Sequence, residues 1–222
     1  RKKTQQDQKK KEEEDLKRAA KESTEFVAKT PYHLVVRPLS KEASCHWGMG
    51  TKWCISSTRS QNYFDSYTRE GAAFFFLLAK RKEIDPAYKK IVVVLDSEGE
   101  FEEYFDTEDN NISLQEFITA VSQAITGVPT GDEIASMEES EPYEVETIRK
   151  GLEPFKGQRG FDFDADDDIN NVAALFRDTF LDSYIDELKE AARTSVEEAP
   201  AGTPDEAYED ALRERVFDYV DV

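Results

Sequence analysis

Short apolar runs in the first half of the chain, each bounded by polar residues, predict β-strands. The runs at 72–79 and 91–95 are almost continuously apolar, as in strands that are buried on both faces. A turn signal joins the second of these runs to another at 101–105, so this pair is predicted to form a hairpin. Together with similar runs at 33–38 and 51–56, the pattern predicts a small, mainly antiparallel sheet of about five strands.

Elsewhere the apolar residues recur at a helical period. Ser113 and Glu116 form a capping box before one such stretch, and Gly127 is placed to end it. Further along, Val172 and Phe176 belong to an apolar stripe with a period of about 3.6 residues. The predicted helices cover 1–29, 60–70, 114–126, 141–150, 171–195 and the residues after a second capping box at 203–206.

A block of strands followed by a block of helices is typical of an α+β fold. We expect a charged helical arm at 1–30, an α+β core at 31–130 and an acidic helical C-terminal region at 131–222. The longest apolar run, 72–79, has eight residues, whereas a membrane-spanning helix needs about 18 or more. We therefore expect no membrane partner.

The acidity of the chain is concentrated in its last two-fifths. The formal net charge is −19, and residues 131–222 account for −18 of it, with 27 acidic against 9 basic residues. Such a field repels the phosphates of nucleic acids and of membrane surfaces, and it attracts basic proteins. The charge therefore argues against direct nucleic-acid binding and favours other proteins with basic surfaces as partners.

Chemically versatile residues gather in one ten-residue segment, Cys45-His-Trp-Gly-Met-Gly-Thr-Lys-Trp-Cys54. Its glycines permit a tight loop whose backbone N–H groups face a ligand, with a hydroxyl group and a cation beside them. The order of residues matches neither the Gly-x4-Gly-Lys-Thr nor the Gly-x-Gly-x-x-Gly pattern, so no cofactor is predicted. The same residues also suit a structural loop with tryptophan anchors in the core. The candidate ligand-binding residues are Gly48, Gly50, Thr51, Lys52 and Trp53.

Cys54 is the candidate nucleophile of this segment, and His46 is its candidate base. A thiol becomes strongly nucleophilic when a base or a positive field stabilises the thiolate. The linear spacing does not bring the two side chains together, and Trp53 and Ile55 flank Cys54 in the manner of a cysteine in a buried strand. We therefore expect a shielded thiol, and the sequence leaves open whether the protein is an enzyme.

The metal-binding patterns in the sequence are incomplete. A zinc site from His33, Cys45, His46 and Cys54 lacks the usual ligand spacing, and a disulfide between the two cysteines suits a secreted chain better. The run 162–168 carries aspartates at alternate positions, as in a calcium-binding EF-hand loop, but it lacks the glycine and the closing glutamate. We expect no metal and interpret these aspartates as favourable charge at the N-terminus of the next helix, with weak cation binding as the alternative.

The segment Gly-Met-Gly-Thr-Lys-Trp-Cys-Ile-Ser at 48–56 is followed by Asn-Tyr-Phe-Asp-Ser-Tyr at 62–67 and by Gly71 before the phenylalanine-rich run. In this combination the sequence resembles a group of uncharacterised bacteriophage proteins, which share a Gly-x-Gly-Thr-x-Trp-Cys element followed by a Tyr-Phe-x-x-Tyr segment. The resemblance covers roughly residues 30–120. It implies a phage origin, a common α+β core and a place in the host cytoplasm or the virion, but no particular reaction.

Three classes of function are compatible with these patterns. The first is a phage-type accessory or virion assembly protein that binds other proteins through its charged helical arm and its acidic C-terminal helices. The second is a small-molecule or nucleotide-binding enzyme that uses the loop at 48–54, and the third is an acidic mimic of nucleic acid. We favour the first, because the charge suits protein binding and no complete catalytic constellation is visible. The chain opens with a purely polar stretch, so we do not expect secretion through a signal peptide.

Overall fold

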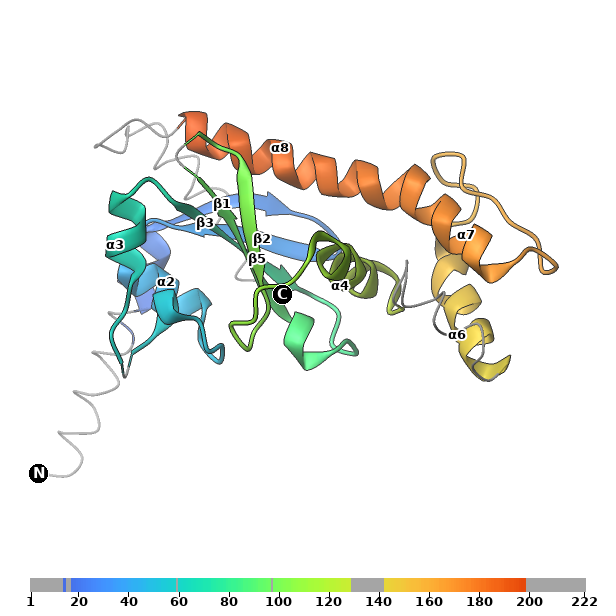
Figure 1. Ribbon diagram of the computed structural model, residues 1–222, viewed down its shortest axis with the longest axis horizontal. Coiled ribbons are helices and arrows are strands. Elements are labelled where there is room, and N and C mark those ends of the chain that lie inside the picture. Colours follow the sequence, from blue (N-terminus) through green and yellow to red (C-terminus); the bar gives the residue numbers. More distant parts are fainter. Residues whose placement is uncertain (1–13, 15–16, 59, 97, 129–141, 199–222) are drawn as a thin grey trace, which may run out of the picture.

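The computed structural model describes residues 14, 17–58, 60–96, 98–128 and 142–198. The predicted helix after residue 203 and most of the predicted arm lie outside these ranges. At the centre is a five-stranded antiparallel sheet with the strand order β1-β2-β3-β4-β5 (Figure 1). The strands are β1 (Thr24–Lys29), β2 (His33–Pro38), β3 (Ala73–Ala79), β4 (Lys90–Leu95) and β5 (Phe101–Phe105).

Helices and short helical turns lie on both sides of this sheet. The α+β class and the sheet of five strands predicted from the sequence are confirmed. The helical elements are α2 (Lys41–Trp47), η1 (Cys54–Ser56), α3 (Phe64–Arg69), η2 (Pro86–Tyr88), α4 (Leu114–Thr126), α6 (Pro142–Leu152), η3 (Glu153–Phe155), α7 (Ile169–Phe176), η4 (Arg177–Leu181) and α8 (Asp182–Glu198).

The two faces of the sheet bury two separate apolar clusters, because successive side chains of a strand point to opposite sides. Phe75 and Val93 belong to the larger cluster, together with residues of α4, α6, α7 and α8. The C-terminal helices therefore share a core with the sheet, and Figure 1 shows α8 lying along it. Phe74 and Phe76 belong to the smaller cluster, together with Trp53 and other residues of the η1 and α3 region.

The first strand departs from the sequence prediction, which places helix throughout 1–29. The helix that contains residues 17–22 ends there, and the hydroxyl group of Thr24 donates a 2.6 Å hydrogen bond to the carbonyl oxygen of Ala20. The following residues pair with β2 as strand β1. Phe26 is buried in the smaller cluster, so packing across the sheet outweighs the weak helical preference of the segment.

The run 51–56 is not a strand, contrary to the prediction. Its backbone N–H groups find acceptors in nearby loops: Lys52 donates to the carbonyl oxygen of Thr107 at 2.8 Å, and Ser56 donates to that of Trp53 at 3.0 Å. These bonds replace a strand ladder, so the β-favouring residues of the run fold into the turn η1. Cys54 accordingly lies in a short helical turn and not in a buried strand.

A helix that the sequence pattern does not reveal, α2, precedes this turn. Its first turn is capped by the hydroxyl oxygen of Ser40, which accepts a 3.1 Å hydrogen bond from the backbone N–H of Ala43. At its end, Gly48 packs so closely on Ser56 that a Cβ atom would lie 2.1 Å from the hydroxyl oxygen. The glycine therefore lets α2 lie directly against η1.

The remaining helices lie near their predicted positions. The capping box of α4 forms as expected, and Gly127 ends the helix with a φ of 83°. Helix α6 runs through Gly151 to Leu152, slightly beyond the predicted end at 150. The predicted helix at 171–195 is interrupted by the π-helical segment η4, across which the rings of Phe176 and Phe180 stack at a centroid distance of 5.4 Å. Within the described ranges, no helix combines the length and the apolar character needed to cross a membrane.

Candidate functional site

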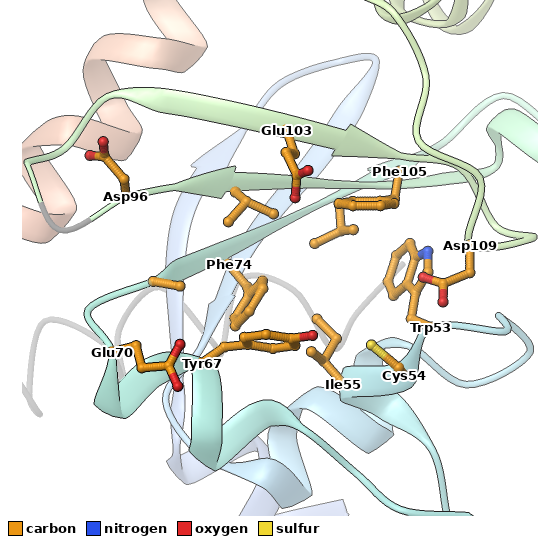
Figure 2. Close-up of a pocket in the computed structure, with 13 residues that line it drawn as sticks. Trp53, Cys54, Ile55, Tyr67, Glu70, Phe74, Asp96, Glu103, Phe105 and Asp109 are labelled. Carbon is orange, nitrogen blue, oxygen red and sulfur yellow. The ribbon is translucent and has the colours of Figure 1, made fainter.

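A cavity of about 530 Å³ lies between the sheet and the segment that carries η1 and α3 (Figure 2). This volume is within the range of about 300–1,000 Å³ that is usual for ligand pockets. The lining residues come from η1, from the end of α3, from three adjacent strands and from the turn after β5. They are Trp53, Cys54, Ile55, Tyr67, Glu70, Ala72, Phe74, Val92, Val94, Asp96, Glu103, Phe105 and Asp109.

The register of three strands builds the floor of the cavity. Val94 is paired with Phe74 on one side and with Glu103 on the other, and Val92 is paired with Phe105. All these side chains point to the same face, because they lie two residues apart on their strands. The floor is therefore apolar and partly aromatic, and a single carboxylate, that of Glu103, rises from it.

One end of the cavity is acidic and aromatic. Tyr67 and Glu70 lie at the end of α3, and the Tyr67 ring packs edge-on against that of Phe74 at a centroid distance of 6.2 Å. Asp96 follows β4, and its Oδ1 atom accepts hydrogen bonds from the backbone N–H groups of Glu98 and Glu100 at 2.8 and 2.9 Å. Figure 2 shows Glu70 and Asp96 at this end, on opposite sides of the cavity.

The other end combines a thiol with a carboxylate. Trp53 is only 1% exposed, and its ring packs on that of Phe76 at a centroid distance of 4.7 Å. Against the larger effect of burial, the polar backbone of Cys54 favours the charged form of the Asp109 carboxyl and lowers its pKa. Figure 2 shows the Asp109 carboxylate beside the Trp53 ring and near the Cys54 sulfur.

A tight turn after β5 holds Asp109 in place. The carboxylate of Asp106 accepts hydrogen bonds from the backbone N–H groups of Glu108 and Asn110 at 2.8 and 3.0 Å, and from the Asn110 side-chain amide at 2.9 Å. Within this turn Asp109 adopts a φ of 69°, which is uncommon for residues other than glycine. The turn therefore fixes the direction of the Asp109 side chain.

The ionisable groups of the cavity favour a positively charged ligand. Burial raises the pKa of the Asp109 carboxyl, although the backbone of Cys54 opposes this change. Burial, and then the Asp109 charge, also raise the pKa of the Cys54 thiol. A bound cation would stabilise the carboxylate, whereas the surroundings of Cys54 oppose formation of a thiolate.

The structure separates the predicted ligand-binding residues. Trp53 alone among them lines the cavity. Gly48 faces Ser56, and an added Cβ at Gly50, whose φ is 87°, would meet no atom within 4 Å. The hydroxyl group of Thr51 donates a 2.7 Å hydrogen bond to the carbonyl oxygen of Gly48, and Lys52 forms an ion pair with Glu108. These four residues shape the loop that presents Trp53 and Cys54.

The predicted catalytic pair is also separated. Cys54 lines the cavity, but His46 is not among the lining residues. The His46 ring instead contacts the Trp47 ring, edge to face, at a centroid distance of 5.0 Å. Burial lowers the pKa of His46, and the positive charges of Lys21, Lys17 and Lys90 lower it further.

The other cysteine and histidine lie elsewhere. The side-chain amide of Asn62 is 3.5 Å from the sulfur of Cys45, and both cysteines are free thiols. His33 is buried on the opposite side of the sheet, where its Nδ1 atom is 2.9 Å from the hydroxyl oxygen of Tyr184 in α8. His33 is thus separated by the sheet from Cys45, His46 and Cys54, which lie in α2 and η1.

The aspartate-rich loop at 162–168 is hydrogen-bonded to the helices on either side of it. The guanidinium group of Arg149 donates hydrogen bonds to the carbonyl oxygens of Asp164 and Asp167. Asp168 caps α7, because its carboxylate accepts hydrogen bonds from the first backbone N–H groups of that helix. In the part of the chain that the structure describes, no three His, Cys, Asp or Glu side chains are placed to hold a metal ion together.

Sequence reasoning does not identify most of the carboxylates that surround the cavity. Glu103 leaves a local signal, since it is an acidic residue on the same face of its strand as Phe105. No local sequence pattern indicates Asp109, because this residue reaches the cavity only through the fold of the turn after β5. The chain matches no protein-family model, no curated protein and no solved structure.

Proposed function

We propose that this protein is a phage-type accessory or assembly protein that binds basic partner proteins, and that the cavity receives basic side chains of the partner. The observation that carries the proposal is the composition of the cavity. Its floor is apolar and aromatic, and the carboxylates of Glu70, Asp96, Glu103 and Asp109 surround it. Among the described residues that line it, none is basic.

Basic side chains satisfy both parts of this lining. The aliphatic stem of a lysine or arginine covers apolar surface while its charged end seeks polar partners. Aromatic rings such as those of Tyr67 and Phe105 attract cations placed over their faces. A guanidinium group also forms paired hydrogen bonds to a carboxylate. A phosphate group would be repelled by the same carboxylates, so a nucleotide has less support as the ligand.

Charge outside the cavity supports a protein partner. The chain carries a formal net charge of −19, which accelerates the encounter with a basic surface. Asp182, Asp186 and Glu190 are exposed on α8. The proposal therefore combines long-range attraction by the acidic surface with short-range binding in the cavity.

The proposal is tested with fluorescein-labelled octa-arginine as a probe and fluorescence anisotropy as the measurement. The double variant Glu103→Gln/Asp109→Asn removes two carboxylates and keeps the size of both side chains. Since a hydrogen bond to a charged group contributes about 1.5–3 kcal/mol, we expect at least a tenfold loss of affinity. Asparagine tolerates the left-handed backbone conformation of residue 109, so the variant is expected to fold.

The matched control is Asp166→Asn/Asp186→Asn, which removes the same charge from exposed positions outside the cavity. We expect less than a twofold change in affinity for this variant. An equal loss in both double variants would show that net charge alone binds the peptide, and it would contradict the proposed role of the cavity.

A further inference from the structure

Two carboxylates of the cavity, those of Glu103 and Asp96, follow the rows of paired residues in the sheet, whereas Glu70 comes from the end of α3 and Asp109 from the turn after β5. Residues that are paired across the strands form rows: Glu103 shares a row with Val94, and Phe105 shares the next one with Val92. On the other side of Val94, Asp96 follows two residues further along the chain. Alternate residues of a strand are about 6.6 Å apart. The floor between the Asp96 row and the Val92 row is therefore about 13 Å long.

The acidic groups are distributed over this length. Figure 2 shows Glu70 and Asp96 at one end, Asp109 at the other end, and Glu103 between them with its carboxylate directed into the cavity. One oxygen of Glu103 accepts a 3.2 Å hydrogen bond from the side-chain amide of Asn111. The second oxygen of Glu103 accepts none from the described residues, and the same holds for the second oxygen of Asp96.

The dimensions of the cavity suit side chains of a partner protein. Its volume of about 530 Å³ lies over a floor about 13 Å long. Side chains that reach down from an extended segment above the floor fit this space.

An extended segment has the period of the floor of the cavity. Its side chains at positions i, i+2 and i+4 point to one side and are about 6.6 Å apart, like the rows of the floor. Resting on the proposed function, we propose that the cavity selects an extended partner segment with basic residues at alternate positions. The three basic side chains meet Glu70 and Asp96, then Glu103, then Asp109, while the intervening side chains face away.

Three labelled nine-residue peptides test this inference, each with three arginines among alanines. In the first the arginines alternate with alanine, in the second they are consecutive, and in the third they occupy every fourth position. We expect the alternating peptide to bind at least five times more tightly than either of the others at physiological salt. Glu103→Gln, which removes the middle carboxylate, is expected to abolish this preference, whereas Asp166→Asn preserves it.

Each other result has a distinct meaning. Equal binding of the three peptides would overturn the proposed spacing and leave the proposed function standing. Tightest binding of the third peptide would overturn the extended conformation in favour of a helix. Failure of all three peptides and of octa-arginine to bind would overturn the proposed function itself.

Discussion

The indole N–H of Trp53 donates a 2.5 Å hydrogen bond to the backbone carbonyl oxygen of Asp106. This bond joins η1 to the turn after β5, two segments that are about fifty residues apart in the chain. It helps to bring Cys54 beside Asp109 at one end of the cavity. The hydrogen bond from the Lys52 N–H to the carbonyl oxygen of Thr107 and the ion pair between Lys52 and Glu108 join the same two segments, so the Trp53 bond is one of several contacts that set the shape of this end.

Trp53→Phe removes this hydrogen bond and keeps an aromatic ring against Phe76. The carbonyl oxygen of Asp106 then keeps only the 3.2 Å hydrogen bond from the backbone N–H of Asp109, so we expect a loss of about 0.5–1.5 kcal/mol in the free energy of unfolding. We also expect weaker binding of octa-arginine, because Asp109 is less firmly placed. Urea denaturation and fluorescence anisotropy measure the two effects.

The control for this substitution is Trp47→Phe. The Trp47 indole N–H donates a 2.9 Å hydrogen bond to the hydroxyl oxygen of Thr24, away from the cavity. We expect Trp47→Phe to lower the free energy of unfolding and to leave the binding of octa-arginine unchanged. Equal effects of the two variants on binding would contradict a specific link between Trp53 and the cavity.

Shortening a buried side chain at the centre of the sheet is expected to lower the free energy of unfolding strongly. Phe76 has no exposed surface and packs in the smaller apolar cluster, so Phe76→Ala leaves a cavity and should cost about 3–5 kcal/mol. Leu39→Ala, at a side chain that is 47% exposed, is expected to cost about 0.5 kcal/mol or less. Chemical denaturation compares the two, and a loss below 1 kcal/mol for Phe76→Ala would refute its assignment to a tightly packed core.

Local patterns predict most of the fold. The apolar run of β3, the turn between β4 and β5 and the capping box of α4 are each formed by residues close together in the chain. Strand β1 has no such signal, because its charged neighbours suit a helix and its strand character depends on pairing with β2. The run 51–56 is the opposite case, since its residues favour a strand but its backbone N–H groups bond to the turn after β5 and within the run itself.

The candidate site is predictable only in part. Composition singles out the segment that contains Trp53 and Cys54, and both line the cavity. Glu103 and Asp109 join them through the register of the sheet and through the hydrogen bond from Trp53 to Asp106. Contacts between residues so distant in the chain leave no local sequence pattern.

His33 is expected to make the fold less stable in acid. Its side chain is 3% exposed, and Tyr184 links its Nδ1 atom to the hydroxyl group of Thr30 by contacts of 2.9 and 2.7 Å. Burial lowers the pKa of His33 to about 4, from 6.5 in the unfolded chain. Between these values the unfolded chain binds the additional proton, so stability falls as the pH decreases from 6.5 to 4. The full loss in the free energy of unfolding that is due to His33 is about 3 kcal/mol.

The substitution His33→Gln isolates this contribution, because glutamine keeps a polar group near Tyr184 but does not titrate. We expect urea denaturation between pH 6.5 and 4 to show a steeper loss of stability for the unsubstituted protein than for the variant. Aspartate and glutamate residues titrate in both proteins, so the difference between the two curves reports His33. Parallel curves would contradict the lowered pKa.

The last prediction concerns Cys54, which is studied alone in a Cys45→Ser background. Burial and the Asp109 charge raise the pKa of the Cys54 thiol, so little thiolate is present at pH 7 and iodoacetamide should react slowly. Asp109→Asn removes the nearby negative charge and is expected to accelerate the reaction, although the thiol remains partly buried. Iodoacetamide is uncharged, so this acceleration reports the thiolate fraction and not attraction of the reagent. Mass spectrometry after timed quenching measures the rate.

His46→Ala separates this interpretation from a catalytic one. The His46 ring contacts Trp47 and is not among the residues that line the cavity, so its removal should leave the rate of Cys54 alkylation unchanged. If Cys54 instead reacted rapidly at pH 6–7 and slowed on His46→Ala, the histidine would be acting as its base. That outcome would make an enzyme with a cysteine nucleophile the better interpretation of the cavity. Slow alkylation that is unaffected by His46→Ala and faster in Asp109→Asn supports a binding site in which Asp109 supplies charge for a cationic ligand.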